Sequence, residues 1–427
     1  MIGLLPLPYD TGHLSLPLEP GDNVQVLTPP SSNFRPPDTP EETVRRALES
    51  PLASPPLPEL VRGKNKIVII TSDHTRPVPS RITLPILLAE IKKANPQAQI
   101  TLLVATGMHR PSTPEELAHK FGRPVLDRVT VVNHRAEADG EMTFLGTLPS
   151  GGELWINRLA VEADLLIGEG FIEPHFFAGF SGGRKSVLPG IASRKTVLFN
   201  HNAQFIASPY ARTGVLGNNP IHKDMVRSAQ QAKLAFILNV VINAGKEIIH
   251  CVAGHPLEAH HAGCEFVRKI TAVKAQPADI VISTNGGYPL DQNVYQSVKG
   301  MTAAEATAKP DAVIIMVARC RDGLGGDYFF HQLADQPSPQ GTMDKIMATP
   351  REETVLDQWE SQILARILIK HKVIMVTDPF LAGYIRQMHM DWAPTLEEAL
   401  SKARAVKGAD ASITVIPDGV GIIVEQS

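Results

Sequence analysis

The stretch that decides the fold is residues 66–107, in which KIVIITSD (66–73), ITLPILLAEIKKA (82–94) and ITLLVATG (100–107) follow one another. The first and third segments are short, continuous apolar runs rich in β-branched residues, and the second is long enough for a helix. A strand, a helix and a second strand in this order predict a right-handed βαβ unit. Because continuous apolar strands indicate a parallel sheet covered on both faces, the sequence predicts an α/β fold.

The same alternation continues through the chain. VTVVNH (129–134), ADLLIGEG (163–170), AFILNVVI (235–242) and KEIIHCVA (246–253) extend the first series, and ADIVISTNGG (278–287), DAVIIMVARC (311–320) and HKVIMVTD (371–378) form a second. We therefore predict two α/β domains with mainly parallel sheets and a cleft between them. The N-terminal domain covers residues 1–268, with a Pro-rich arm at 28–58, and a smaller C-terminal domain covers 276–406. The strands in residues 411–427 fit either domain, a return to the N-terminal one included.

The composition describes a folded protein whose partners are small molecules. Hydrophobic residues make up 43% and charged residues 20% of the 427, which excludes a disordered chain. Lys and Arg number 41 against 44 Asp and Glu, so we expect neither nucleic acid nor a membrane surface as a partner. The three cysteines form no Cys-x-x-Cys motif, and neither a signal peptide nor a long apolar run is present, so we expect a cytoplasmic protein.

Polar side chains gather directly after the predicted strands. In an open parallel sheet, ligands bind at the carboxyl ends of the strands, near the point where the strand order reverses. Asp73, His74, Thr75 and Arg76 follow one strand, and His109 follows the next. A loop ion pair and a structural histidine are the alternatives to a binding site at these positions.

The third such loop, residues 168–190, contains His175 and the run Ser-Gly-Gly-Arg-Lys-Ser that ends at Ser186. We expect its glycines to expose backbone N–H groups as an anion-binding nest, with Arg184 and Lys185 over it. The Walker pattern is excluded, because it requires glycine directly before the lysine, where Arg184 stands.

Two further positions are candidates. His201 follows the glycine-rich loop, and Gln296 and Lys299 are three residues apart, so that one helix face would present both to a carboxylate. A solvated amphipathic helix is the alternative for the latter pair. The histidines at 255, 260 and 261 lack the His-Glu-x-x-His spacing of a zinc site and are expected on a solvated helix face.

Taken together, the motifs resemble those of the nickel-dependent lactate racemase family, in the same order and over nearly the whole chain. The matching segments are Asp73-x-Thr-Arg76-Pro-x-Pro, Thr106-Gly-Met-His109-Arg, Glu173-Pro-His175-Phe-x-Ala-Gly-x-Ser-Gly-Gly-Arg-Lys185-Ser, Asn200-His201, Tyr295-Gln296-x-x-Lys299 and Trp359.

The resemblance implies a nickel-pincer nucleotide, a pyridinium mononucleotide that holds nickel through two sulfurs and a ring carbon. By this resemblance Lys185 binds the cofactor covalently, His201 supplies the remaining nickel ligand, and Asp73, His74, Thr75 and Arg76 hold the nucleotide. Soft sulfur donors with one imidazole suit nickel(II). Proteins that synthesise the cofactor are then partners of the chain.

The resemblance further implies a racemase or epimerase of a small 2-hydroxy acid that works by reversible hydride transfer. His109 and His175 are the acid–base pair, and Arg76, Tyr295, Gln296 and Lys299 bind the substrate. Histidine suits the task because its ordinary pKa of about 6.5 allows one ring to be neutral and its partner charged. A non-catalytic nickel or nucleotide carrier is the alternative, and an NAD-type oxidoreductase is a weaker one, since no Gly-x-Gly-x-x-Gly fingerprint joins a strand to a helix.

Overall fold

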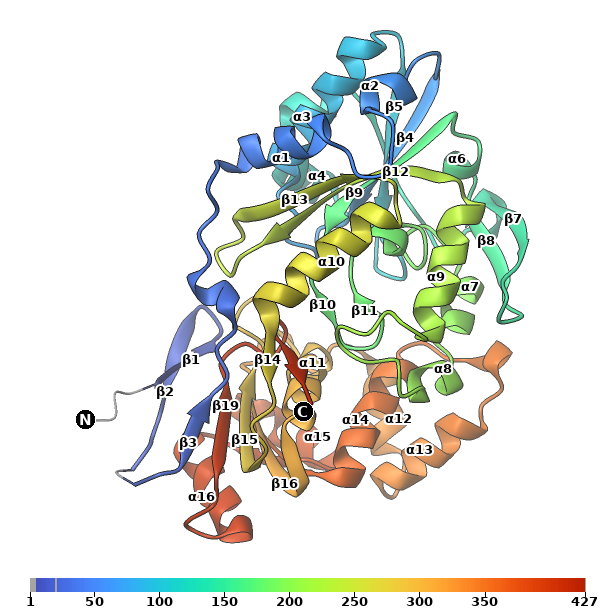
Figure 1. Cartoon of the computed structure of the whole chain (residues 1–427). Coiled ribbons are helices and arrows are strands. Elements are labelled where there is room, and N and C mark those ends of the chain that lie inside the picture. Colours follow the sequence, from blue (N-terminus) through green and yellow to red (C-terminus); the bar gives the residue numbers. More distant parts are fainter. Residues whose placement is uncertain (1–4, 20, 427) are drawn as a thin grey trace. The chain divides into compact units, whose positions relative to one another are not determined.

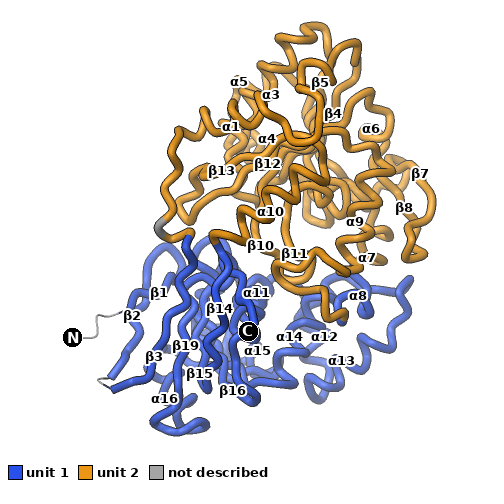
Figure 2. The backbone as a smooth tube through the Cα atoms, in the orientation of Figure 1, with its two compact units in different colours: residues 1–30, 201–207, 271–427 blue, residues 31–200, 208–270 orange. Residues whose placement is uncertain are grey.

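A computed structural model describes residues 5–19 and 21–426, and contacts between residues divide the chain into two compact units. Unit 1 holds the described residues up to Pro30, residues 201–207 and those from Thr271 onward, and unit 2 holds residues 31–200 and 208–270 (Figure 2). Both units are α/β structures with mainly parallel sheets, which confirms the predicted fold class.

Unit 2 is built on a six-stranded sheet (Figure 1). In spatial order its strands are β13 (Ile248–Gly254), β12 (Leu234–Ile242), β9 (Leu165–Phe171), β4 (Lys66–Ser72), β5 (Gln99–Ala105) and β6 (Thr130–Asn133). All neighbours are parallel except β12 and β13. The chain moves outward from β4 to β6 and then returns to β9 on the other side. The strand order therefore reverses between β4 and β9, where such sheets bind ligands.

Helices cover this sheet, and β7 (Met142–Thr147) and β8 (Glu153–Asn157) form a separate antiparallel hairpin in the same unit. The helices are α1 (Pro40–Glu49), α2 (Leu57–Leu60), α3 (Ser80–Ala94), α4 (Pro114–Phe121), α5 (Arg123–Leu126), α6 (Arg158–Val161), α7 (Arg194–Asn200), α9 (Pro220–Gln231) and α10 (Glu258–Thr271). Apolar residues of α1, α2 and α3 form one core with the sheet. α1 and α4 begin with capping boxes, formed by Thr39 with Glu42 and by Thr113 with Glu116.

Unit 1 contains a second six-stranded sheet, in which every pair is parallel. Its spatial order is β18 (Asp391–Ala393), β17 (Lys372–Val376), β16 (Ala308–Val317), β15 (Ala278–Thr284), β19 (Ile413–Ile416) and β3 (Val24–Val26). The helices of this unit are α8 (Ala203–Ala207), α11 (Val294–Glu305), α12 (Asp327–Ala334), α13 (Pro339–Ala348), α14 (Gln358–Lys370), α15 (Ala382–Gln387) and α16 (Leu396–Lys407).

The division of the chain differs from the expected domain boundaries at three places. The first described residues form a hairpin of β1 (Leu5–Tyr9) and β2 (Gly12–Leu16) and the edge strand β3, and all of them belong to unit 1. The strand β19 lies inside the sheet of unit 1, and β20 (Ile423–Glu425) pairs with β14 (Ala272–Lys274). The alternative in which the last strands return to the N-terminal domain is therefore wrong. The third difference is the segment 201–207, which was expected in the N-terminal domain and belongs to unit 1.

Candidate functional site

Three loops of unit 2 that carry predicted site residues follow the neighbouring strands β9, β4 and β5. Because these strands are parallel, their carboxyl ends lie at one edge of the sheet. Asp73, His109 and the glycine-rich loop therefore follow strand ends, as the sequence predicts, while their role as a site remains a prediction.

Asp73 and His109 form a hydrogen-bonded pair. Nδ1 of His109 lies 2.7 Å from Oδ2 of Asp73, whose side chain is only 1% exposed, while the histidine is 45% exposed. Burial alone would raise the pKa of Asp73, but the hydrogen bond and charge of His109, with help from Arg76 and Thr75, lower it well below its usual range. The ionised carboxylate of Asp73 therefore holds the His109 ring in one orientation through Nδ1, and Nε2 of that ring can contact a ligand.

The remaining residues of the first loop hold its shape. Oδ1 of Asp73 accepts hydrogen bonds from the Thr75 hydroxyl at 2.7 Å and the Thr75 N–H at 3.1 Å. Arg76 donates to the same hydroxyl, and Lys120 of α4 donates to the Arg76 carbonyl at 2.8 Å. Nδ1 of His74 lies 3.0 Å from the hydroxyl of Ser112, so one nitrogen of this ring contacts the protein.

His175 and Lys185 meet in the glycine-rich loop. Nε2 of His175 lies 3.0 Å from Nζ of Lys185, and Nδ1 of the same ring accepts a hydrogen bond from the Ala178 N–H at 3.3 Å. The ring stands on the short hairpin of β10 (Pro174–His175) and β11 (Gly179–Phe180), and Lys185 lies in the 3-10 turn Gly183–Ser186. The structure therefore joins two residues that are ten positions apart in the sequence.

The expectation of an exposed anion nest in this loop is wrong for the N–H groups of Ser181, Gly183 and Lys185. They donate to the Glu173 carbonyl, the Asn239 side chain and the Gly182 carbonyl, respectively. Gly183 has a φ of +54°, and a Cβ there would lie 2.6 Å from the ring of His260. Close packing against α10 explains the glycine at this position.

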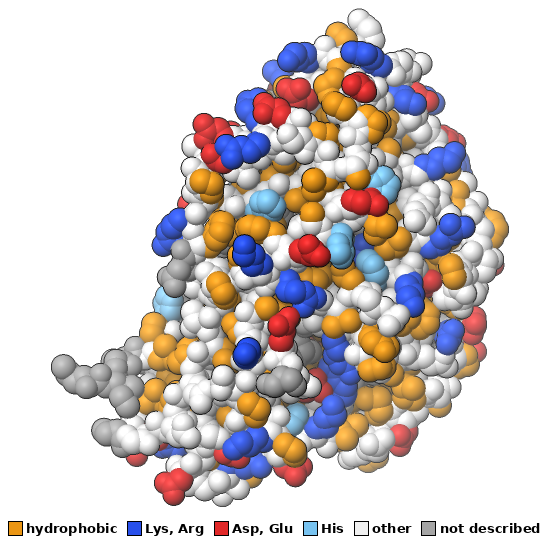
Figure 3. Space-filling model, in the orientation of Figure 1, with side chains coloured by type: hydrophobic (Ala, Val, Ile, Leu, Met, Phe, Trp, Pro, Cys, Tyr) orange, Lys and Arg blue, Asp and Glu red, His pale blue; other side chains and the backbone are white. Residues whose placement is uncertain are grey.

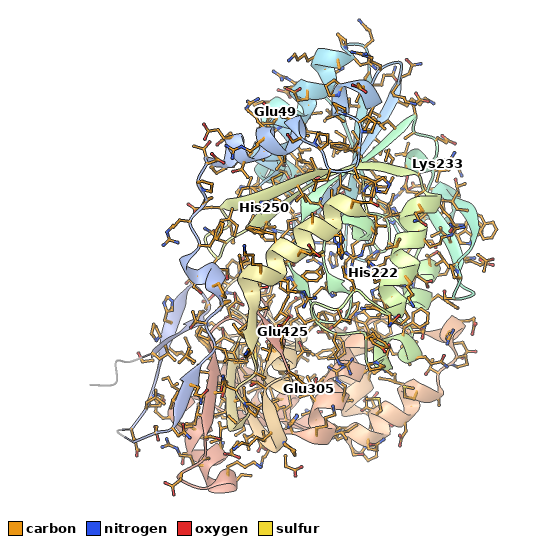
Figure 4. All side chains as sticks on the ribbon, viewed as in Figure 1. Glu49, His222, Lys233, His250, Glu305 and Glu425 are labelled. Carbon is orange, nitrogen blue, oxygen red and sulfur yellow. The ribbon has the colours of Figure 1, made fainter. Side chains whose placement is uncertain are left out.

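Arg184 does not cover an anion site either, because its guanidinium is buried within the protein. It donates to Nδ1 of His222 at 3.0 Å and to the carbonyls of Ala178 and Phe180, and it lies 2.8 Å from Nε2 of His260. His222 stands on α9 (labelled in Figure 4), and burial lowers its pKa to about 3, followed by the charge of Arg184. The carbonyls of Ser181 and Gly182 also accept hydrogen bonds from Arg184, so two neutral histidines and four carbonyls surround its guanidinium.

The solvated helix face expected for His260 is also wrong, since this side chain is 1% exposed. Burial and then Arg184 lower its pKa well below the usual value. Residues 260, 264 and 267 lie on one face of α10, and Cys264 and Val267 are buried as well. This i, i+4, i+7 spacing was the signal in the sequence that sequence reasoning missed.

In unit 1, the expected pair on one helix face is present. α11 begins after the N-cap Asn293, whose side chain accepts from the Gln296 N–H at 2.9 Å. Nζ of Lys299 donates to Oε1 of Gln296 at 2.6 Å, so the two side chains meet as the spacing predicts. A cationic and an amide group side by side can bind a carboxylate.

An aromatic cluster in unit 1 links three further candidate residues, namely Tyr295, Trp359 and His201. The indole N–H of Trp359, on α14, donates to the Tyr295 hydroxyl at 3.0 Å, and the rings of His201 and Trp359 lie 5.0 Å apart, edge to face. The short segment of His201 is held to this unit, because Gln362 of α14 donates to the Ala203 carbonyl at 2.8 Å. Figure 2 shows α8 in the colour of unit 1.

Within residues 5–19 and 21–426, no three His, Cys, Asp or Glu side chains gather in a group that could hold a metal ion. Cys251, Cys264 and Cys320 are buried thiols, and burial raises the pKa of each well above its usual value. Among the described helices none is long and apolar enough to cross a membrane. Acidic and basic side chains are interspersed on the face in Figure 3.

An α/β fold with hydrogen-bonded histidines at strand ends is typical of enzymes that move protons on small molecules. Two family models match this chain: the lactate racemase N-terminal domain over residues 9–214 and the lactate racemase C-terminal domain over residues 273–424. The chain belongs to the lactate racemase family, and it is an isomerase.

Individual relatives agree with this assignment. Lactate racemases of Thermoanaerobacterium thermosaccharolyticum and Lactiplantibacillus plantarum are each 54% identical to it, over 98% of this chain and 99% of theirs. The structure of the T. thermosaccharolyticum lactate racemase apoprotein matches with a TM-score of 0.95, over 99% of this chain and all of that one. A Thermotoga maritima protein, 19% identical with a TM-score of 0.68, covers 91% of this chain and 98% of its own and shares the fold.

Proposed function

We propose that this isomerase inverts the α-carbon of a small 2-hydroxy acid, with lactate as the first substrate to test, by reversible hydride transfer. The observation that carries the proposal is the fixed pair of histidines in unit 2. Each ring is held through Nδ1, His109 by Asp73 and His175 by the Ala178 N–H, and Nε2 of His175 lies 3.0 Å from Nζ of Lys185, the residue proposed to hold the cofactor. Two imidazoles with defined orientations suit two opposite proton transfers.

In one direction a histidine removes the hydroxyl proton while the α-hydrogen leaves as a hydride, and a planar 2-oxo acid forms. The proton of the hydroxyl group is far more acidic than the α-hydrogen next to a carboxylate. When the hydride returns to the opposite face, the other histidine supplies the hydroxyl proton. His109 and His175 thus exchange the roles of base and acid when the direction of the reaction reverses.

The nickel-pincer nucleotide would supply a reversible hydride acceptor when bound. The donors of this chain fit such a group, because Cys251, Cys264 and Cys320 are buried thiols whose pKa is raised by burial, so the soft sulfur donors would come with the cofactor and the chain would add an imidazole. Lys185 would hold it covalently, His201 would supply one imidazole to the nickel, and the loop from Asp73 to Arg76 would hold the nucleotide.

Gln296 and Lys299 would bind the substrate carboxylate, with Arg76 and Tyr295 as further contacts. Lys299 provides the charge and Gln296 an amide donor, and their hydrogen bond keeps both groups at one place on α11. A fixed carboxylate orients the α-carbon, and orientation contributes to the rate of any such reaction.

The test uses protein made together with the cofactor pathway. Incubation with one pure enantiomer of lactate, followed by chiral chromatography, should give the racemic mixture, and protein made without the pathway should give none. A carrier would release the nucleotide intact without changing the substrate. Accumulation of free pyruvate together with stoichiometric reduction of an added electron acceptor such as NAD would instead indicate an oxidoreductase.

A further inference from the structure

A carboxyl group of unit 1, that of Glu360, is buried without a hydrogen-bond partner among the described residues. Glu360, in the first turn of α14, has an exposed fraction of 0%, and neither of its carboxyl oxygens has a hydrogen-bond partner within the described residues. An ionised carboxylate in such a place is costly, so a buried acid without partners tends to hold a proton. No part of the proposed mechanism accounts for this group.

Glu305 of the same unit shows how a buried carboxylate is normally accommodated (labelled in Figure 4). Both of its oxygens accept hydrogen bonds from Arg366, at 3.0 and 2.7 Å, and Lys370 adds a third at 3.2 Å. Burial raises its pKa, but these two cations outweigh burial and lower it overall. Glu360 differs from Glu305 because no Arg or Lys side chain in the described part of the chain donates a hydrogen bond to its carboxyl group.

The surroundings of Glu360 include the proposed carboxylate-binding residues. α11 packs against α14, and the Trp359 indole bonds to Tyr295 directly beside it. The charges that act on Glu360 are those of Lys299, from α11, and Asp357, at the start of α14. Tyr295 is the other titratable group facing it. The helices α8, α12 and α13 also pack on α14, and none of their described residues contributes a charge at Glu360.

Burial raises the pKa of Glu360 to about 8, with Asp357 acting in the same direction and Lys299 in the opposite one. The electrostatics therefore agree with the hydrogen-bond geometry, in which no donor stabilises an anion. Below this pH the carboxyl group is neutral. Above it, an anion stands in the field of Lys299.

We propose that Glu360 is a positioning residue of the substrate site, whose buried carboxyl group holds a proton so that Lys299 keeps its full positive charge for the carboxylate of the substrate. The inference rests on the proposed function, in which Lys299 binds that carboxylate. Loss of the proton would place a second anion near Lys299, which would compensate its charge and repel the substrate. Binding of the substrate and of the proton are then coupled and strengthen each other.

The experiment measures binding of 2-hydroxy-2-methylpropanoate, a 2-hydroxy acid without an α-hydrogen, to the full-length protein by calorimetry between pH 6 and pH 9.5. Wild-type protein should bind at least tenfold more weakly at pH 9.5 than at pH 6. The Glu360→Gln variant keeps a neutral side chain of the same size, so its affinity should change less than about twofold over this range. Glu305→Gln is the matched control and should keep the wild-type pH dependence.

Proton uptake gives a second readout that a purely structural role would not produce. Calorimetry at pH 8 in two buffers of different ionisation enthalpy should show proton uptake on binding to the wild type and none to Glu360→Gln. An equal pH dependence in the wild type and this variant would overturn the inference and leave the proposed function intact.

The Lys299→Ala variant distinguishes a failure of the proposed function, in which Lys299 binds the carboxylate, from a failure of the inference about Glu360. Its failure to weaken binding would contradict the carboxylate assignment, and with it both proposals. Titration of protein with carboxyl-¹³C-labelled glutamate by NMR needs no ligand and should show a carboxyl signal that titrates near pH 8 and is absent from Glu360→Gln. Absence of that signal from the wild type would overturn the inference alone.

Discussion

Nζ of Lys185 lies 3.0 Å from Nε2 of His175, whose Nδ1 accepts a hydrogen bond from the Ala178 N–H. An amine next to an imidazole can pass a proton to it and so become nucleophilic. The geometry therefore places Lys185 beside a group that can activate it.

We predict that protein made with the cofactor pathway carries a covalent adduct on Lys185. Intact and peptide mass spectrometry would locate the added mass, and Lys185→Arg should abolish it. Lys195→Arg is a matched control, because Lys195 is exposed and paired with Glu153 on the surface hairpin. A fully active preparation with unmodified Lys185 would rule out the covalent attachment.

Asp73→Asn should lower kcat by about 10²-fold or more at equal nickel content, since general acid–base catalysis contributes roughly 10²–10⁴-fold. The variant keeps the size of the side chain but removes the charge that orients His109. Steady-state kinetics, normalised to the nickel content of each preparation, would measure the effect. Retention of the wild-type kcat would show that His109 does not need the Asp73 charge.

The same variant makes a prediction about stability and pH. Because the pKa of Asp73 is lowered in the folded chain, its ionised form stabilises the protein above the unfolded-state pKa of about 3.9, and this contribution is lost as the pH falls below that value. We expect the variant to be less stable by about 1.5–3 kcal/mol at pH 7, the magnitude of a charged hydrogen bond. Urea unfolding at pH 7, 5 and 3 should show this difference shrinking only at the lowest pH.

His260→Ala should cost about 1–3 kcal/mol of unfolding free energy, because it leaves the buried Arg184 with one acceptor fewer. His255→Ala on the neighbouring surface should stay within about 0.5 kcal/mol. Folding lowers the pKa of His260, so below about pH 6.5 the unfolded chain binds a proton that the folded chain does not. The wild-type protein therefore loses stability as the pH falls below this value, and this group contributes up to about 1.4 kcal/mol per pH unit. The variant should show a smaller slope, and an unchanged slope would mean that His260 is protonated in the fold.

His201→Ala should retain the nucleotide but lose nickel or its normal absorption spectrum. The proposed covalent link to Lys185 would not involve this imidazole, whereas the metal would need it as a ligand. Metal analysis and the visible spectrum would measure the loss, and Gln204→Ala, in the same short segment, serves as the control. Equal nickel content in His201→Ala and the wild type would argue against the ligand role.

The sequence predicts the sheets well because strand signals are local. Continuous apolar runs such as residues 66–72 require burial on both faces, whatever the remainder of the chain does. The edge strand β3 is different, since its three residues VQV become a strand only by pairing with β19, nearly 400 positions away. No local pattern contains that information.

The site shows the same distinction between local and distant relationships. The pairing of Gln296 with Lys299 could be predicted from helix geometry, because they are neighbours in the chain. The bonds of Asp73 to His109 and of Arg184 to His222 join residues 36 and 38 positions apart. The first depends on which strands are adjacent, and the second on the packing of α9 against the turn Gly183–Ser186. A glycine such as Gly183 was interpreted as exposing its N–H, whereas its missing side chain makes room for His260.

The last prediction concerns the hydrogen itself. If His109 and His175 each handle the hydroxyl proton of one enantiomer, either alanine variant should keep its cofactor and yet lose racemisation in both directions, because interconversion needs both half-reactions. Substrate deuterated at carbon 2, converted in ordinary water, should give inverted product that retains deuterium, since a hydride does not exchange with solvent. His119→Ala is a suitable control, because this histidine lies in the last turn of α4. Loss of the label at the rate of racemisation would mean that a base removes the α-proton, and the hydride mechanism would be wrong even if both histidines proved essential.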